Sequence, residues 1–110
     1  MAGAAAAYMR QAWLKAPQII VVEPTSAPAL QKSIEAEKCV FANGPDSVMG
    51  RLDCKEPSLI ALNGLARDAN VFLTLDDDEV MPVLSHLATQ DLATTASGGA
   101  GVAAAMNSDV

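Results

Sequence analysis

Apolar and polar positions along the chain change their spacing several times, and each change predicts a different element. Residues 2–15 are strong helix formers, and Pro17 ends this segment. The run "QIIVV", residues 18–22, is continuously apolar and rich in β-branched residues, as expected of a strand buried on both faces. The pattern therefore predicts a helix followed by a buried strand.

A second helix and a second strand are expected next. Residues 25–38 have helical spacing, with Thr25 or Ser26 as the N-cap and Pro28 tolerated in the first turn. The segment "CVFAN", residues 39–43, is short and apolar and is followed by Gly-Pro, so it predicts a strand that ends at a turn.

The alternation continues after an irregular stretch. Residues 46–57 show no clear period and predict a loop with one helical turn. Residues 58–69 return to helical spacing, with Ser58 as the N-cap. The segment "NVFLTL", residues 70–75, then predicts a third strand.

Two further helices are expected in the last third of the chain. Residues 76–88 predict a helix, in which Asp76 and Glu79 have the spacing of a capping box. Residues 93–107 predict an extended entry, a glycine-rich turn and a last helix.

This order of elements predicts an α/β fold. Helices that alternate with strands favour a mostly parallel sheet between two layers of helices, which makes three layers in all. With 110 residues, we expect a single domain, or part of one, over residues 1–110. The first helix has no capping residue before it, although its first N–H groups need partners. We therefore expect that a preceding segment is missing.

Composition narrows the classes of function. Hydrophobic residues make up 51% of the chain, and the net charge is −6 with only seven Lys and Arg, which argues against a nucleic-acid partner. Charged residues interrupt every apolar run before it reaches membrane-spanning length, and the alanine-rich start lacks the positive region of a signal peptide. We expect no membrane partner and a cytoplasmic location.

Two cysteines, one histidine and an acidic run could carry chemistry. Cys39 and Cys54 lie in no Cys-x-x-Cys or Cys/His cluster, so reduced, partly buried thiols are expected rather than a disulfide or a metal site. His86 has no nucleophile or carboxylate paired with it locally, which favours an ordinary helix residue over a general base. Residues 76–79, "DDDE", favour helix capping over a metal site, because the alternating acids of an EF-hand loop are absent.

Glu23 and the segment "SGGAG", residues 97–101, are expected at the sheet edge where open α/β folds bind ligands. A carboxylate in the position of Glu23 can hold a ribose hydroxyl or cap a loop, and the residues leave both roles open. The Ser97 hydroxyl and free N–H groups at a helix start can hold a ligand. The residues alone favour a tight turn with Ser97 as the N-cap.

Four segments, in this order, resemble pyridoxal-phosphate (PLP) enzymes of the tryptophan synthase β and threonine dehydratase type. They are "IIVVEP", "SVMGRLDCKEPS", "VFLTLDD" and "ATTASGGAGVAAA". The likeness is greatest to diaminopropionate ammonia-lyase and its lyase relatives. It implies the large domain of a fold type II enzyme, PLP as the cofactor and an amino acid as the substrate.

The resemblance also implies roles for four residues. Ser97 matches the serine whose hydroxyl faces the pyridine nitrogen of PLP, and Gly98 and Gly99 match positions where the backbone lies close to the ring. Glu23 matches the glutamate of a "VEP" motif beside the cofactor pocket. The resemblance gives no residue of this chain a catalytic or metal-binding role.

The chain also departs from these enzymes. Their Schiff-base lysine and glycine-rich phosphate loop match no segment, and the four lysines stand in other contexts: Lys15, Lys32, Lys38 and Lys55. The sequence is therefore interpreted as the C-terminal part of a PLP-dependent ammonia-lyase that acts by α,β-elimination. By itself it is expected to be inactive, with an unpaired sheet edge that favours self-association or a homo-oligomer.

Two other interpretations stay open at this point. One is a non-catalytic α/β binding or interaction module without PLP ancestry, which would fold cooperatively as a monodisperse protein. The other is half of a nucleotide-binding domain with Glu23 as the ribose acid. It requires a G-x-G-x-x-G loop before the first helix, which the sequence lacks.

Overall fold

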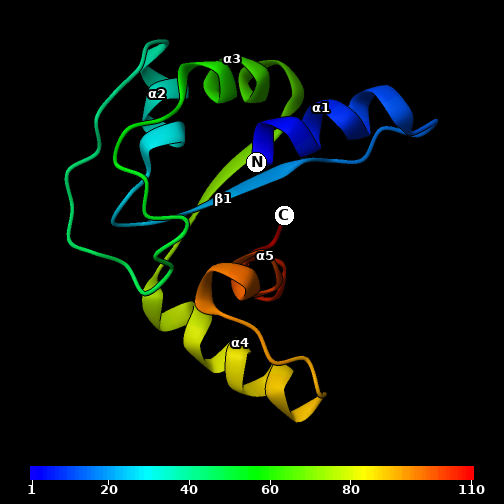
Figure 1. The fold of residues 1–110 in the computed structure, drawn as a ribbon, viewed down its shortest axis with the longest axis vertical. Helices are drawn as coiled ribbons and strands as arrows, with labels where there is room; N and C mark the ends of the chain where they lie inside the picture. The colour runs from blue at the N-terminus through cyan, green and yellow to red at the C-terminus, as the bar shows by residue number, and fades with distance from the viewer.

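The computed structural model describes residues 1–110 and has helices on both faces of a short parallel sheet (Figure 1). The two strands are β1 (Ile20–Pro24) and β2 (Val71–Leu75), paired in parallel with Ile20 opposite Val71. The helices are α1 (Ala2–Ala12), α2 (Ala29–Ala36), α3 (Leu59–Asp68), α4 (Asp77–Thr89) and α5 (Ala96–Asn107). The predicted α/β class, with helices flanking a parallel sheet, is confirmed.

Alternating side chains of the strands explain the three layers. Successive residues of a strand point to opposite faces, so β1 and β2 contribute to two separate apolar cores. The α1–α3 core contains Ala6, Ile19, Val21 and Leu65. The α4–α5 core contains Met49, Leu75, Val80, Val83, Ala100 and Ala103. In Figure 1, α3 and α4 accordingly lie on opposite sides of the strands.

Two helix starts follow the local sequence signals. The Ser58 hydroxyl accepts a hydrogen bond from the Ala61 N–H at 3.4 Å and caps α3. At α4, the Glu79 carboxylate accepts from the Asp76 N–H at 2.8 Å, which is one half of the capping box. Both predicted caps are confirmed, because each needs only residues within one turn.

A clamp built on Arg10 joins α1 to the rest of the fold. Its guanidinium group donates to the carbonyl oxygens of Asp68 and Pro17 at 2.8–3.0 Å and to the Asn70 side-chain oxygen at 2.6 Å. The same Asn70 oxygen accepts from the Ile19 N–H at 2.8 Å. The end of α1 is therefore fixed to the starts of both strands.

The start of α2 differs from the sequence prediction. Helix α2 begins at Ala29 with Pro28 in the N-cap position, so the prediction of Thr25 or Ser26 as the N-cap is wrong. The free N–H groups of its first turn find their acceptor in Glu23 of the preceding strand instead. That carboxylate makes a hydroxyl cap unnecessary.

The predicted strand over residues 39–43 is also wrong, since the sheet has two strands. The Val40 N–H donates to the Ser33 hydroxyl at 2.9 Å, and the Ala42 N–H donates to the Lys55 carbonyl at 2.7 Å. Because these N–H groups are bonded outside the sheet, the segment cannot extend it. It belongs to a long irregular connection between α2 and α3, coloured teal to green in Figure 1.

The glycine-rich segment is helical rather than a turn. Helix α5 begins at Ala96, and its cap is Thr95, whose hydroxyl accepts from the Gly98 N–H at 3.1 Å. Ser97 therefore lies in the first helical turn, and its prediction as the N-cap is wrong. No glycine in the chain has a positive φ. The helices of the chain are also too short or too polar to cross a membrane.

Two leucines of α3 test the contribution of the α1–α3 core. Leu65 is 1% exposed and Leu59 is 61% exposed. We expect Leu65→Ala to lower the free energy of unfolding by about 2–5 kcal/mol, because the truncation leaves a cavity in the core. Leu59→Ala is the matched control and should change it by less than about 0.5 kcal/mol. Urea unfolding followed by circular dichroism gives both values, and equal losses would contradict the described core.

Candidate functional site

A cavity of about 370 Å³ lies where the N-terminus of α1 meets β1 and the connection between α2 and α3. Its lining is mostly apolar, with a few polar groups supplied by residues 1–3, Glu23, Arg51, Cys54, Glu56 and Ser58. Such a lining, in which a few polar groups converge on apolar walls, is typical of small-molecule sites. Of the four predicted cofactor-binding residues, Glu23 alone lines this cavity.

Glu23 is held between β1 and α2. Its Oε1 accepts from the Leu30 N–H at 2.8 Å, its Oε2 accepts from the Gln31 N–H at 2.9 Å, and the residue is 6% exposed. Burial raises the pKa of the Glu23 carboxyl, and the two amide hydrogen bonds oppose part of this rise. Of the two roles left open by the sequence, the geometry supports capping, because both oxygens already serve the N-terminus of α2.

Ser97 does not line this cavity, but it is hydrogen-bonded to Arg51, which does. The Ser97 Oγ accepts a hydrogen bond from the Arg51 N–H at 3.0 Å, and Arg51 lines the cavity. A hydroxyl carries one donor beside its acceptor lone pairs. The Ser97 proton therefore stays available for an uncharged acceptor, such as a pyridine nitrogen, although Ser97 itself does not line the cavity.

Gly98 and Gly99 do not line the cavity, and local packing accounts for their size. A Cβ atom on Gly98 would overlap the Thr94 hydroxyl. A Cβ atom on Gly99 would lie 2.6 Å from the Leu84 Cδ2 atom of α4. Contacts with Leu84 of α4 and with Thr94 of the connection before α5 thus account for the two glycines, and their approach to a cofactor ring stays a prediction.

The N-terminus of α1 supplies free donors to the same cavity. The first hydrogen bonds of α1 run from the Ala4 and Ala5 N–H groups to the Met1 carbonyl, so the N–H groups of Ala2 and Gly3 have no partner within the helix. Unpaired N–H groups and the helix dipole at this position favour an anion such as a phosphate group. The lack of a capping residue before the first helix pointed to these free N–H groups in the sequence. Nothing in the sequence around Arg51 indicated that it would line a site.

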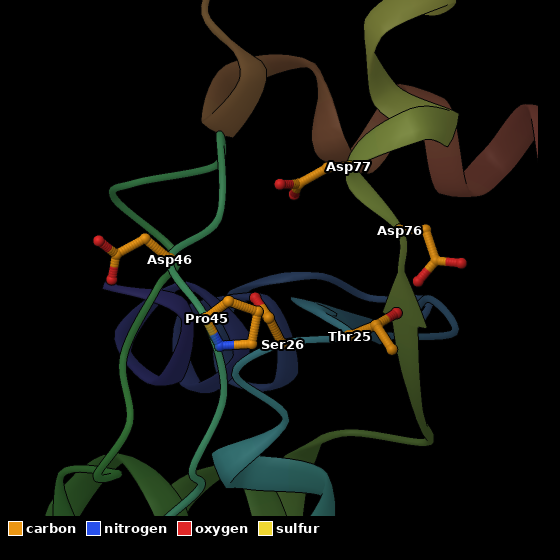
Figure 2. Close-up of a pocket in the computed structure, with 6 residues that line it drawn as sticks. All are labelled: Thr25, Ser26, Pro45, Asp46, Asp76 and Asp77. Atoms are coloured by element: carbon orange, nitrogen blue, oxygen red, sulfur yellow. The ribbon is translucent and has the colours of Figure 1, made fainter.

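A second hollow, of about 340 Å³, lies at the carboxyl ends of the two strands (Figure 2). It is lined by Thr25, Ser26, Pro45, Asp46, Asp76 and Asp77. Both carboxylate oxygens of Asp77 already accept hydrogen bonds, from the Ser47 hydroxyl at 2.6 Å and the Val48 N–H at 2.9 Å. No group of three acidic, histidine or cysteine side chains is arranged to hold a metal ion. The acidic run therefore serves helix capping and loop anchoring.

The cysteines and the histidine lie apart from one another on the surface. Cys39 and Cys54 are both free and exposed, so the prediction of partial burial is wrong. Both belong to the irregular connection between α2 and α3. His86 is exposed in the last turn of α4, and no nucleophile or carboxylate bonds to it.

Glu23 gives a test of this geometry through pH. Because its folded pKa is raised, its protonated form favours the folded state below pH 4.5, its ordinary pKa, and this contribution is lost as the pH rises through the raised value. Asp53 and Asp68 affect the pH dependence of stability at a lower pH than Glu23 does. Hydrogen bonds from Lys55 and Arg67 lower the pKa of these two carboxyls, so their contributions are lost only as the pH falls below 3.8.

We therefore expect stability to fall in the native chain as the pH rises above 4.5 through the raised pKa of Glu23, and this component to be absent from Glu23→Gln. The exposed Glu35 of α2 gives the matched control, Glu35→Gln, which should follow the native curve. Urea midpoints across this pH range measure the difference. Parallel curves for the native chain and Glu23→Gln would show that the Glu23 carboxyl is not perturbed.

Comparisons with known proteins agree on one family. The family model described as "Pyridoxal-phosphate dependent enzyme" matches residues 1–109. No curated protein matches the sequence. Because the family model spans nearly the whole chain, an α/β module without PLP ancestry is not supported.

Two solved structures have the same fold. A threonine deaminase from T.th. superposes with a TM-score of 0.86 at 16% identity, over 96% of this chain and 38% of that chain. Maize serine racemase superposes with a TM-score of 0.77 at 20% identity, over 86% of this chain and 28% of that chain. This chain thus spans well under half the length of either protein. The fold and the family match together show that the chain belongs to the pyridoxal-phosphate dependent enzymes.

Proposed function

We propose that this chain forms one wall of the cofactor pocket of a PLP-dependent ammonia-lyase, which releases ammonia from an amino acid by α,β-elimination. The observation that carries the proposal is the 370 Å³ cavity, where the N-terminus of α1 and Glu23 meet Arg51 and its hydrogen bond to Ser97. The motif order favours a diaminopropionate-like substrate, or one like serine or threonine, and a cytoplasmic enzyme.

We propose that two groups of this chain serve the polar ends of PLP. The free N–H groups of Ala2 and Gly3 suit its phosphate group, and the Ser97 hydroxyl suits its pyridine nitrogen. PLP supplies an electron sink that stabilises negative charge at the substrate α-carbon. A neutral hydroxyl partner would leave the ring nitrogen largely unprotonated, and the apolar walls of the cavity would limit the access of water to the ring. Glu23 supports the pocket by fixing α2 to β1.

We further propose that the chain by itself does not catalyse this reaction. The cavity lining contains no lysine, and Lys15, Lys32 and Lys38 are exposed. The Lys55 ammonium group donates to three oxygen atoms elsewhere. The nucleophilic lysine that PLP chemistry requires would then come from outside this chain.

A matched pair of cysteine variants tests the pocket. Cys54 lines the cavity and Cys39 does not, and both thiols are free and exposed. We expect Cys54→Lys, incubated with PLP and reduced with borohydride, to be labelled at residue 54 severalfold more than at any native lysine. Cys39→Lys should show no such preference. Peptide mass spectrometry measures the label, and equal labelling of the two variants would refute the pocket.

The native chain supplies the second half of this test. With PLP and 2,3-diaminopropionate, serine or threonine, it should release no ammonia above PLP alone. It should also carry no borohydride-fixed label concentrated on one lysine. Ammonia release that depends on a single native lysine would contradict the proposed inactivity while leaving the pocket intact.

The sheet suggests that copies of this chain associate. Each strand is paired on one side only, because the sheet consists of β1 and β2, and unpaired strand edges are sites of association. We expect sedimentation velocity to show a species larger than 11.4 kDa that grows with concentration. A single monomeric boundary at all concentrations would exclude this part of the proposal.

A further inference from the structure

Lys55 differs from the other lysines in its surroundings. Its side chain is 22% exposed, whereas Lys15, Lys32 and Lys38 are exposed. Its Nζ atom lies 3.1 Å from the Ser26 carbonyl oxygen, 2.9 Å from the Pro45 carbonyl oxygen and 2.5 Å from the Asp53 Oδ1. An ammonium group has three donors and no acceptor, so all three donors are used.

The three acceptors come from different parts of the chain. Ser26 follows β1, whereas Pro45 and Asp53 belong to the irregular connection between α2 and α3, and Asp53 lies two residues before Lys55. Figure 2 shows Ser26 and Pro45 side by side at the edge of the second hollow. Two main-chain carbonyls and one carboxylate form an all-oxygen cluster, which is the ligand type that hard cations take.

Backbone packing forces these oxygens together. A Cβ atom on Gly44 would overlap the Ser26 carbonyl oxygen, so the backbone at Gly44 lies directly against that carbonyl. Pro45, the residue after Gly44, supplies a second carbonyl oxygen that accepts a hydrogen bond from Lys55. Partial negative charges converge at this point with the Asp53 carboxylate, and their mutual repulsion makes a positive charge necessary there.

The same cluster is continuous with the loop that reaches Ser97. The Asp53 Oδ2 accepts from the Ser47 N–H at 3.1 Å, and the Ser47 hydroxyl donates to Asp77 at the start of α4. Arg51 lies between Ser47 and Asp53 and donates its N–H to the Ser97 hydroxyl. The ammonium group thus bonds to Asp53 at one end of the segment that carries Arg51, and Asp53 bonds to Ser47 at the other end.

We propose that the Lys55 ammonium group is a built-in cation that positions residues 47–54 against Ser97, in place of a bound monovalent cation at this oxygen cluster. Lys55 is a positioning residue in this proposal, because it touches neither the cavity nor Ser97. The proposal does not depend on PLP and can fail or hold independently of the proposed function.

Two substitutions separate the charge from the space that the side chain fills. Lys55→Ala removes the ammonium group and opens room for an ion, whereas Lys55→Met removes the charge and keeps the stem. We expect both to lower the unfolding midpoint in tetramethylammonium chloride, whose cation is too large for the site. Replacing that salt by ammonium or potassium chloride at equal ionic strength should restore most of the loss in Lys55→Ala, in a saturable manner.

Lys55→Met and the native chain serve as controls in the same salts. Lys55→Met and the native chain should respond equally to all three salts. In Lys55→Ala, the Arg51 amide should exchange faster with deuterium than in the native chain, and ammonium should restore its protection. A midpoint unchanged by Lys55→Ala, or a loss that no small cation restores, would overturn the proposal.

Chemical modification of the native chain decides the case even if Lys55→Ala does not fold. Lys55 should be methylated by formaldehyde and a mild reductant much more slowly than Lys15, Lys32 and Lys38, because its three donors are engaged. Peptide mass spectrometry gives the four rates. Methylation of Lys55 in the folded chain as fast as that of Lys15 would refute the engaged ammonium group.

Discussion

The buried carboxylate of Glu23 is the contact on which the layers around the candidate site depend. It is the last polar group of β1 before Pro24, and it supplies the acceptors that the first amides of α2 lack. Helix α2 in turn donates from the Gln31 side chain to the Phe72 carbonyl of β2 at 3.2 Å. The Glu23 and Gln31 side chains together therefore set the position of α2 against both strands, and with it one wall of the cavity.

The candidate site is assembled from segments that lie far apart in the sequence. The cavity takes its donors from the first turn of α1, its carboxylate from the end of β1, and Arg51 from an irregular connection that has no regular hydrogen-bond ladder of its own. Such a connection holds its shape only if its polar groups find fixed partners. Here Ser33, Ser47, Asp53 and Asp77 supply them through side-chain hydrogen bonds.

Features governed by neighbouring residues could be predicted from the sequence, and features governed by distant ones could not. Ser58 and the pair Asp76 and Glu79 act within one turn, so their helix starts were predictable. Residues 39–43 have the composition of a strand. However, the Ala42 N–H donates to the carbonyl oxygen of Lys55, thirteen residues later, and is therefore not available to a neighbouring strand. The spacing of Thr25 and Ser26 suited a cap, but a carboxylate from the preceding strand had already filled that role.

For the predicted site residues, too, local position could be predicted and contacts with distant residues could not. The sequence placed Glu23 and Ser97 at the correct ends of their elements, since each follows or opens a recognisable segment. It could not show that Arg51, 46 residues before Ser97, would link Ser97 to the cavity. Nor could it show that the α5 cap is Thr95, because Thr94, Thr95 and Ser97 are all suitable residues and tertiary packing selects among them.

The fit of Gly98 and Gly99 against Thr94 and Leu84 gives both glycines a role in packing that needs no cofactor. A Cβ atom at position 99 would require the Leu84 side chain of α4 to move, and one at position 98 would require the Thr94 side chain to move. The two glycines therefore report on the packing of α5. The hydroxyl at position 97, which that packing does not require, is the part of the motif whose loss or retention bears on chemistry.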